Sequence, residues 1–400
     1  MQYSSLPFTL VGSDEPCVLA VGALYTAAEP LVDRRKARGR HYPLALIVTV
    51  AVLATLVGYR RVESVADWVK LRCHELHVLF GPKRARMPQH TTWSRMLGTA
   101  LDVVALEPLG QQVFCPPSVG EVPDRCRITV ALDGPTMRGT IPRGHSRGVH
   151  LLAADAPAQG IVVFQVAVDT KEHELVAAPV VLHHLALPGM RMTGDAMFTQ
   201  RAVSVQIVEG GGDDLWMLKD HQPTLREKIE LRFEPACVRA GWSAPPVDVT
   251  TARTVERGHG RIEERILTTS SMLADDRDWP YLAHVFKLEY GSKDIVTGQE
   301  TTAVRYGVTS APVTVLDAKG LLVSTREHWG IETGLHRRRD GMRTRTGQAP
   351  HVLAILNTVG LGLLGRQGIS TVAEAQRSIA YHLDRFLHQV TASRRAEAMA

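Results

Sequence analysis

Hydrophobic residues in the first third of the chain recur at the spacing of helices. An uncharged run of 16 residues, PLALIVTVAVLATLVG (43–58), begins with Pro43, a residue favoured in the first turn of a helix. Apolar residues then recur every three or four positions through 62–73. We therefore predict a helical domain over residues 31–113. Residues 1–30 show no period, and we expect an irregular lead-in there.

A further helix is predicted from Thr91 or Thr92, either of which is placed to cap its N-terminus. Its expected buried stripe consists of Trp93, Met96, Leu97, Leu101 and Val104. The Pro- and Gly-rich stretch 114–126 reads as a linker to the next part of the chain.

Strands and helices alternate after this linker. Three β-rich runs fall within 43 residues, at 127–134, 149–156 and 160–169. The order then predicted is a helix at 171–187, a strand at 190–196, a helix at 199–211 and a strand at 213–220. A meander of three strands followed by strand–helix units predicts a mixed α/β sheet.

The last part of the chain shows two different patterns of apolar and polar residues. Residues 245–310 alternate between apolar and polar positions, which predicts a β-rich insertion. A helix follows over 317–339, and two more are expected in the tail. The predicted domains are thus a catalytic α/β domain at 125–340, which contains the insertion, and C-terminal helices at 341–400.

The distribution of charge indicates a class of binding partner. The net charge is +5 and the basic residues are clustered at 33–40, 81–86 and 336–347. Several cations on one surface suit the phosphates of a nucleic acid, although solvated faces and loop ends are an equally open reading of each run. The five cysteines form no C-x-x-C pair and no secretory signal is seen, so we expect a reducing, cytoplasmic location.

Two of the predicted strands end in aspartate. Asp133 closes the run ITVAL, and Asp195 follows the strand that begins at residue 190. Glu332, on the helix at 317–339, is a third acid. Three carboxylates brought together can hold two divalent cations on either side of a phosphodiester. Taken singly, each acid also reads as a turn, capping or surface residue, the assignment given to the remaining candidates: Asp155, Asp169, Asp213, Asp214 and Asp317.

Five motifs occur in order along the chain, and together they resemble a known family. They are ALDGPTMRGT, MTGDAMFTQ, LKDHQPTL, ERGHGRIEER and REHWGIETGLH. The set is similar to the DDE transposases of bacterial insertion sequences, in the branch that includes the H-repeat-associated proteins of Rhs elements. The resemblance covers about residues 31–366 and includes an associated helical N-terminal domain.

The resemblance implies a fold and an activity. The fold is a ribonuclease H-like mixed sheet with helices on both faces, and the metal-binding triad is Asp133, Asp195 and Glu332. Two Mg²⁺ or Mn²⁺ ions would serve the cutting and rejoining of double-stranded DNA, at the terminal inverted repeats of the element and at the target. The family also implies a homodimer on paired ends, a nucleoid-associated location in the cytoplasm and no membrane.

The resemblance also points to residues that contact DNA. Arg257, His259 and Arg261 would contact the bound DNA end, with an exposed β-turn carrying ordinary charges as the alternative. His328 and Arg339 fall where related branches carry cations near the glutamate. Arg138 is the cation close to Pro135, where the family usually has lysine.

Two alternatives stay open at this point. The segment after His336 is shorter and more basic than in the family, so a catalytically inactive copy that still binds DNA is the second hypothesis. A protein anchored to the membrane by 43–58 is the third, because this run approaches the length of a spanning helix.

Overall fold

The computed structural model forms two compact units, which are described one at a time. The first comprises Met1–Ser118, Gly134–Glu174 and Glu332–Ala400, and the second Val119–Asp133 and Leu175–Ile331. The residues that the structure describes are 6–9, 16–19, 21–81, 86–114, 127–134, 141, 150–168, 174–219, 222–234, 248–258, 260–274, 276, 278–331, 348–365, 376 and 379.

The first unit is mainly helical. Its helices are α1 (Val21–Ala28), α2 (Leu44–Leu56), α3 (Val62–Leu71), α4 (Cys73–Phe80), α5 (His90–Arg95), α6 (Val103–Leu106), α7 (Leu109–Phe114) and α13 (Ala349–Gly365). A short 3₁₀ turn, η1 (Ala37–Gly39), precedes α2. The lead-in differs from the irregular segment that we expected, because it contains α1 and the antiparallel strands β1 (Leu6–Thr9) and β2 (Pro16–Leu19).

Helix α2 is the centre of this unit. All of its residues are buried, and it packs against α1, α3 and α13. By length and composition alone, Ala37–Leu56 would suffice to cross a membrane, but 72% of its most apolar window is buried inside the protein. A helix that is apolar all round is expected in a protein core as well as in a membrane.

The helix predicted from Thr91 is divided into three parts. A π-helical turn, η2 (Met96–Ala100), follows α5, and Asp102 starts α6 by accepting a hydrogen bond from the Val104 backbone N–H (3.2 Å). The restart rotates the stripe, so Val104 is 72% exposed, whereas the other four members are buried as predicted. Placing Val104 in the core was therefore wrong.

A β-hairpin in the first unit packs on α7 and α13. Its strands, β4 (His150–Ala156) and β5 (Ile161–Val168), are antiparallel. Asp155 lies within β4 and is 5% exposed. The assignment of Asp155 to a turn was wrong, since the carboxylate is part of a buried strand.

The second unit is a mixed sheet with helices. The strands β3 (Ile128–Asp133), β6 (Met190–Gly194) and β7 (Asp213–Met217) run parallel, in the order β3-β6-β7. Its helices are α8 (Glu174–His184), whose first residue belongs to the other unit, α9 (Arg201–Glu209), α10 (Pro223–Phe233) and α11 (Ala318–Ile331), with a 3₁₀ turn η6 (Ala196–Phe198). These elements match the predicted strand–helix alternation.

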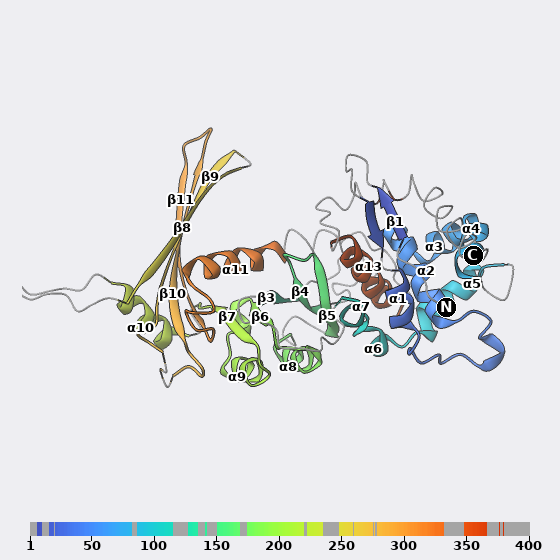
Figure 1. The fold of residues 1–400 in the computed structure, drawn as a ribbon, viewed down its shortest axis with the longest axis horizontal. Coiled ribbons are helices and arrows are strands. Elements are labelled where there is room, and N and C mark those ends of the chain that lie inside the picture. The colour runs from blue at the N-terminus through green and yellow to red at the C-terminus, as the bar shows by residue number, and fades with distance from the viewer. Residues whose placement is uncertain are drawn as a thin grey trace, which may run out of the picture. The chain divides into compact units, whose positions relative to one another are not determined.

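Long antiparallel strands extend this sheet beyond β7. They are β8 (Thr250–Gly258), β9 (Arg261–Ser270), β10 (His284–Asp294) and β11 (Glu300–Thr309), and β11 pairs with β7. Figure 1 shows them as a twisted arm with α11 beside its base. These strands lie within residues 245–310, where the alternation of apolar and polar residues predicted β structure. The base of the arm and α11 share a core of nine buried residues: Leu215, Leu267, Phe286, Leu288, Ala311, Leu316, Ala318, Leu321 and Leu322.

Two buried aspartates of β7 have different partners, Arg127 for Asp213 (3.1 Å) and Ser310 after β11 for Asp214. Asp213 and Asp214 are 6% and 0% exposed, so assigning them to a turn was wrong. Asp214 Oδ1 accepts a hydrogen bond from the Ser310 N–H (2.8 Å), and the Ser310 hydroxyl is 2.9 Å from the Asp214 N. Burial raises the pKa of the Asp214 carboxyl. Asp317 behaves as expected for a cap, accepting from the Gly320 N–H at 2.8 Å.

Candidate active site and nucleic-acid interface

Asp133 and Asp195 lie side by side at one edge of the parallel sheet. Leu132 of β3 pairs with Gly194 of β6, and each aspartate is the next residue along its strand. Neighbouring strands are about 5 Å apart, so the two residues are at equal register one strand spacing from each other. The C-terminal edge of parallel strands is where α/β proteins place their ligands.

The two aspartates also share a face of the sheet. Alternation along the strands puts Asp133 on the side of Thr129, and Asp195 on the side of Arg191. The Ser324 hydroxyl of α11 lies 3.3 Å from Thr129 Oγ1, and Arg191 Nη1 donates to it at 3.1 Å. The face that carries Asp133 and Asp195 is therefore the face on which α11 packs.

Asp195 is open to solvent. It is exposed, and its carboxylate makes no hydrogen bond or ion pair within the described part of the chain. The backbone around it is fixed: the Phe198 N–H bonds to the Asp195 carbonyl at 2.9 Å, and Gly194 is packed so closely that a Cβ there would lie 2.9 Å from the Phe198 ring. An exposed carboxylate on a rigid backbone suits a metal ligand.

A buried pair next to Gly134 was missed by the sequence reasoning. His150 Nε2 lies 2.6 Å from Glu174 Oε1, and the two side chains are 4% and 2% exposed. A Cβ on Gly134, the residue after Asp133, would meet Glu174 Oε1 at 2.2 Å. The Glu174 carboxylate therefore fills the space beside this glycine. The only sequence signal was its place in the stretch VDTKEHELVAAPVVL (168–182), which matches the family.

Several predicted site residues lie outside the described residues. They are Arg138, His259, Glu332 and Arg339, and Asp169 is outside as well. His328 is described, on α11 and partly buried. Glu332 is the residue directly after Ile331, where α11 ends. In the described ranges alone, no group of three or more His, Cys, Asp or Glu is placed to hold a metal.

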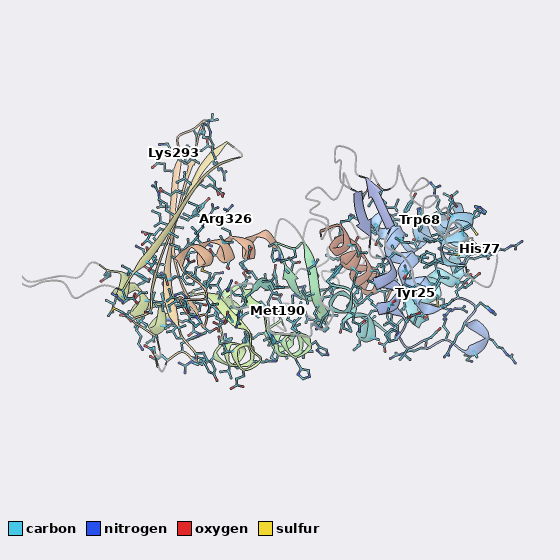
Figure 2. All side chains as sticks on the ribbon, in the orientation of Figure 1. Tyr25, Trp68, His77, Met190, Lys293 and Arg326 are labelled. Carbon is cyan, nitrogen blue, oxygen red and sulfur yellow. The ribbon has the colours of Figure 1, made fainter. Side chains whose placement is uncertain are left out.

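The structure separates Arg257 and Arg261, the two described arginines that were predicted to contact the DNA end. Arg261 pairs with Gly258 on β8 and shares the face of Leu267, which packs on α11. Arg257 pairs with Ile262 and lies on the opposite face. Because β11 is antiparallel to β7, the arm projects beyond the same sheet edge as Asp195, and Figure 2 shows Lys293 of β10 at its far end and Arg326 on α11. Of these two arginines, Arg261 is the one on the aspartate face.

Charged side chains on the aspartate face of the arm bond to one another and to α11. Arg326 Nη2 of α11 bonds to Glu256 Oε2 of β8 at 2.8 Å. Arg265 bonds to Glu263 (2.6 Å) and lies 5.2 Å from the centre of the Tyr290 ring. These cations are occupied by neighbours, so they fix α11 and the arm strands to one another.

Two of the basic runs meet in the first unit. A hollow of about 1060 Å³ is lined by Arg34, Arg35, Lys36 and Arg38 from the run 33–40, and by Arg86 from the run 81–86. Arg95, from the end of α5, joins them. The described residues that line this hollow include no Asp or Glu.

Sequence relatives support one family. Residues 27–112 match the DDE_Tnp_1-associated domain. The chain is 31% identical over 281 residues to an "Uncharacterized protein in dhlA 3'region" of Xanthobacter autotrophicus. The alignment covers 69% of this chain and 90% of the relative. It is 26% identical over 248 residues to the "H repeat-associated putative transposase YhhI" of Escherichia coli K12, covering 59% of this chain and 63% of that one.

Similarity extends to a third sequence relative and to a solved structure. The "Putative protein YbfL" of Escherichia coli K12 is 26% identical over 345 residues, covering 83% of this chain and 87% of the relative. A cryo-EM structure of the piggyBac transposase synaptic complex with hairpin DNA aligns over 98% of this chain and 84% of its own, with 10% identity and a TM-score of 0.40, too low to carry an argument. From the sequence relatives and the associated domain, the chain belongs to the family of DDE-type transposases that includes the H repeat-associated proteins.

Proposed function

We propose that this protein is an active transposase that cuts and rejoins double-stranded DNA at the ends of an insertion sequence. The observation that carries the proposal is the placement of Asp133 and Asp195 at equal register on β3 and β6, on the α11 face. Family membership supplies the reaction class. A ribonuclease H-like core, action as a homodimer on paired ends and a cytoplasmic location belong to the same proposal.

Glu332 is proposed as the third ligand. Leu321 and Thr325 of α11 are 0% and 4% exposed, and both face the interior of the second unit. Positions 4 and 11 residues after Leu321 return to nearly the same side of an α-helix, so a helix that continued past Ile331 would carry position 332 on the side of Thr325. The periodicity of α11 thus supports the assignment of Glu332 to the side that carries the two aspartates.

The donor set fits hard divalent cations. Carboxylate oxygens of Asp133 and Asp195 are the ligands that Mg²⁺ and Mn²⁺ prefer. When bound, two such ions supply an activated attacking oxygen and stabilise the leaving oxygen of the phosphodiester. In this proposal the exposed Asp195 and the partly buried Asp133 would hold the ions at the edge of the sheet.

The test is cleavage of the element's own DNA ends in the presence of Mg²⁺. We expect the wild-type chain to nick at the element boundary, and Asp195→Asn or Asp133→Asn to lower the rate by at least about 1000-fold. Asp67→Asn is the matched control, because Asp67 is an exposed aspartate on α3, outside the site. Equal cleavage by Asp195→Asn and by wild type would overturn the proposal.

The second candidate is a DNA-binding protein without catalysis. It is motivated by the short basic segment RRRDGMRTRTG (337–347), which follows the proposed third ligand and departs from the family. This candidate predicts salt-dependent binding to element ends with no metal-dependent nicking by the wild-type chain. Nicking that depends on Asp133 and Asp195 would exclude it.

A further inference from the structure

The loop that forms one side of the basic hollow is held in shape by a buried arginine. Arg35 is 8% exposed; its Nε and Nη2 bond to Asp33 (2.8 and 2.6 Å), Nη1 to the Gly39 carbonyl (3.1 Å) and Nη2 to the Tyr42 carbonyl (2.6 Å). Arg40 adds bonds to the carbonyls of Arg35 (2.8 Å) and Asp33 (2.7 Å). A loop with this many internal bonds presents its remaining side chains in fixed places.

The other side of the hollow is tied to this loop. The Tyr42 hydroxyl donates to the Arg86 carbonyl at 2.6 Å, and Arg34 pairs with Asp102. Arg95 ends α5 at the π-helical turn η2, and the Thr99 hydroxyl of that turn bonds to the Arg95 carbonyl (2.8 Å). π-Helical turns of this kind are frequent at functional sites. The hollow is thus built from three segments joined by hydrogen bonds.

Four cations in the hollow form no ion pair within the described part of the chain. Lys36, Arg38, Arg86 and Arg95 are exposed, and their side chains make no ion pair or hydrogen bond with any described residue. The cations that do have partners, Arg34 and Arg35, are neutralised by Asp102 and Asp33. Four like charges around one concave surface repel one another, and a polyanion relieves that repulsion.

We propose that this hollow binds the phosphodiester backbone of duplex DNA through Lys36, Arg38, Arg86 and Arg95. The inference rests on the proposed function and extends it, because it names the surface of the helical domain that would contact DNA. An anionic membrane is the less suitable partner, because proteins meet lipid surfaces with amphipathic faces that insert apolar side chains, whereas this site is concave and cationic. Contacts to phosphate position a protein on DNA without reading sequence.

The test is the salt dependence of DNA binding. The full chain carrying Asp195→Asn is titrated without metal against a labelled duplex, and anisotropy gives the dissociation constant at several NaCl concentrations. Each phosphate contact contributes about 0.9 to the slope of log K against log salt, so Lys36→Gln, Arg38→Gln, Arg86→Gln and Arg95→Gln should each reduce its magnitude by about 0.9. The loss should be the same for element ends and for unrelated duplexes.

Lys70→Gln is the matched control, since Lys70 is an exposed lysine of α3 outside the hollow. The inference is overturned if the four variants behave like Lys70→Gln, if the wild-type chain does not bind duplex at low salt, or if the substitutions abolish binding to phosphatidylserine vesicles and spare DNA. The proposed function is tested separately by metal-dependent cleavage. If cleavage requires Asp195 but DNA binding does not depend on the four cations, only this inference is contradicted. If DNA binding depends on the four cations but no cleavage occurs, only the catalytic proposal is contradicted.

Discussion

Gly134, the residue after Asp133, has no room for a side chain. The Glu174 carboxylate occupies the space where a Cβ would project from Gly134, and His150 holds that carboxylate at 2.6 Å. The carboxylate could retreat only by giving up a buried hydrogen bond, which costs free energy when the group is left unsatisfied. The backbone beside the first predicted metal ligand is therefore sensitive to the smallest substitution.

We expect Gly134→Ala to lower the free energy of unfolding by about 1–3 kcal/mol, the usual cost of overpacking a filled site. Metal-dependent cleavage should fall as well, because Asp133 is the neighbouring residue. Gly291→Ala on β10 is the control, since a Cβ there meets nothing within 4 Å. Urea unfolding measures both variants, and equal stabilities would contradict the packing argument.

Glu107 makes the stability of the first unit depend on pH. Burial raises the pKa of its carboxyl to about 7, against a smaller lowering by the Ala167 N–H. The folded state then holds the proton more tightly than the unfolded chain, so this contribution is complete below about pH 4.5 and is lost as the pH rises toward 7. The loss is at most about 3 kcal/mol.

The substitution Glu107→Gln removes the titrating group and keeps the shape of the side chain. The variant should gain stability relative to wild type as the pH rises from 4.5 to 7, as measured by urea unfolding at several pH values. A difference between the two proteins that stays constant across this window would show that Glu107 titrates normally.

At the scale of elements, α11 is the helix that leads to the third acid, and two kinds of contact fix it. Leu321 and Leu322 sit in the core formed with β9 and β10, while Ser324 bonds to Arg191 and Thr129 beneath it. One face of α11 is thus committed to the sheet. The opposite face is solvated: Val323 is 50% exposed.

Leu321→Ala should therefore destabilise the protein by about 2–5 kcal/mol, through lost burial and the cavity left behind. Val323→Ala on the same helix should cost less than about 0.5 kcal/mol, as expected for a surface substitution. Thermal or urea unfolding distinguishes them. Similar effects of the two substitutions would mean that α11 is not docked through this face.

Elements with a regular period of hydrophobic residues were predictable from the sequence, whereas the burial of carboxylates was not. Alternation of apolar and polar residues identified β8–β11, and the uncharged run gave α2. Asp155 and Asp214 were placed in turns because Asp is rare in strands, yet both are buried in β4 and β7. For Asp214, the partner that makes burial possible is Ser310, 96 residues away, and such long-range hydrogen bonds leave no local pattern. The helix break at Asp102 was missed for a different reason, because a strong apolar stripe continued across it.

The candidate site likewise has features that were predictable from the sequence and features that were not. Equal register of Asp133 and Asp195 follows from two strands that each end in aspartate, a feature readable from the sequence. The Gly134–Glu174–His150 packing and the hollow built from Arg35 depend on contacts between distant segments. Charge clustering identified the basic runs, but it could not show that two of them line one surface.

At the scale of the whole molecule, the helix that could suit a membrane lies in a protein core. Every residue of α2 is buried against neighbouring helices, so no apolar face is left for lipid. We expect the full chain to stay in the supernatant when cells are lysed without detergent and membranes are removed by centrifugation. Recovery only from the membrane pellet, released by detergent but not by high salt, would instead support the anchored protein.

Asp133 and Asp195 are proposed to hold a divalent cation between them. Titration of the chain with Mn²⁺, followed by electron paramagnetic resonance of the free ion, measures this without DNA or catalysis. The account predicts that Asp133→Asn and Asp195→Asn each weaken Mn²⁺ binding at least about tenfold, the effect of about 1.4 kcal/mol, while Asp67→Asn leaves it unchanged. Mn²⁺ binding that is the same in all four proteins would contradict the account.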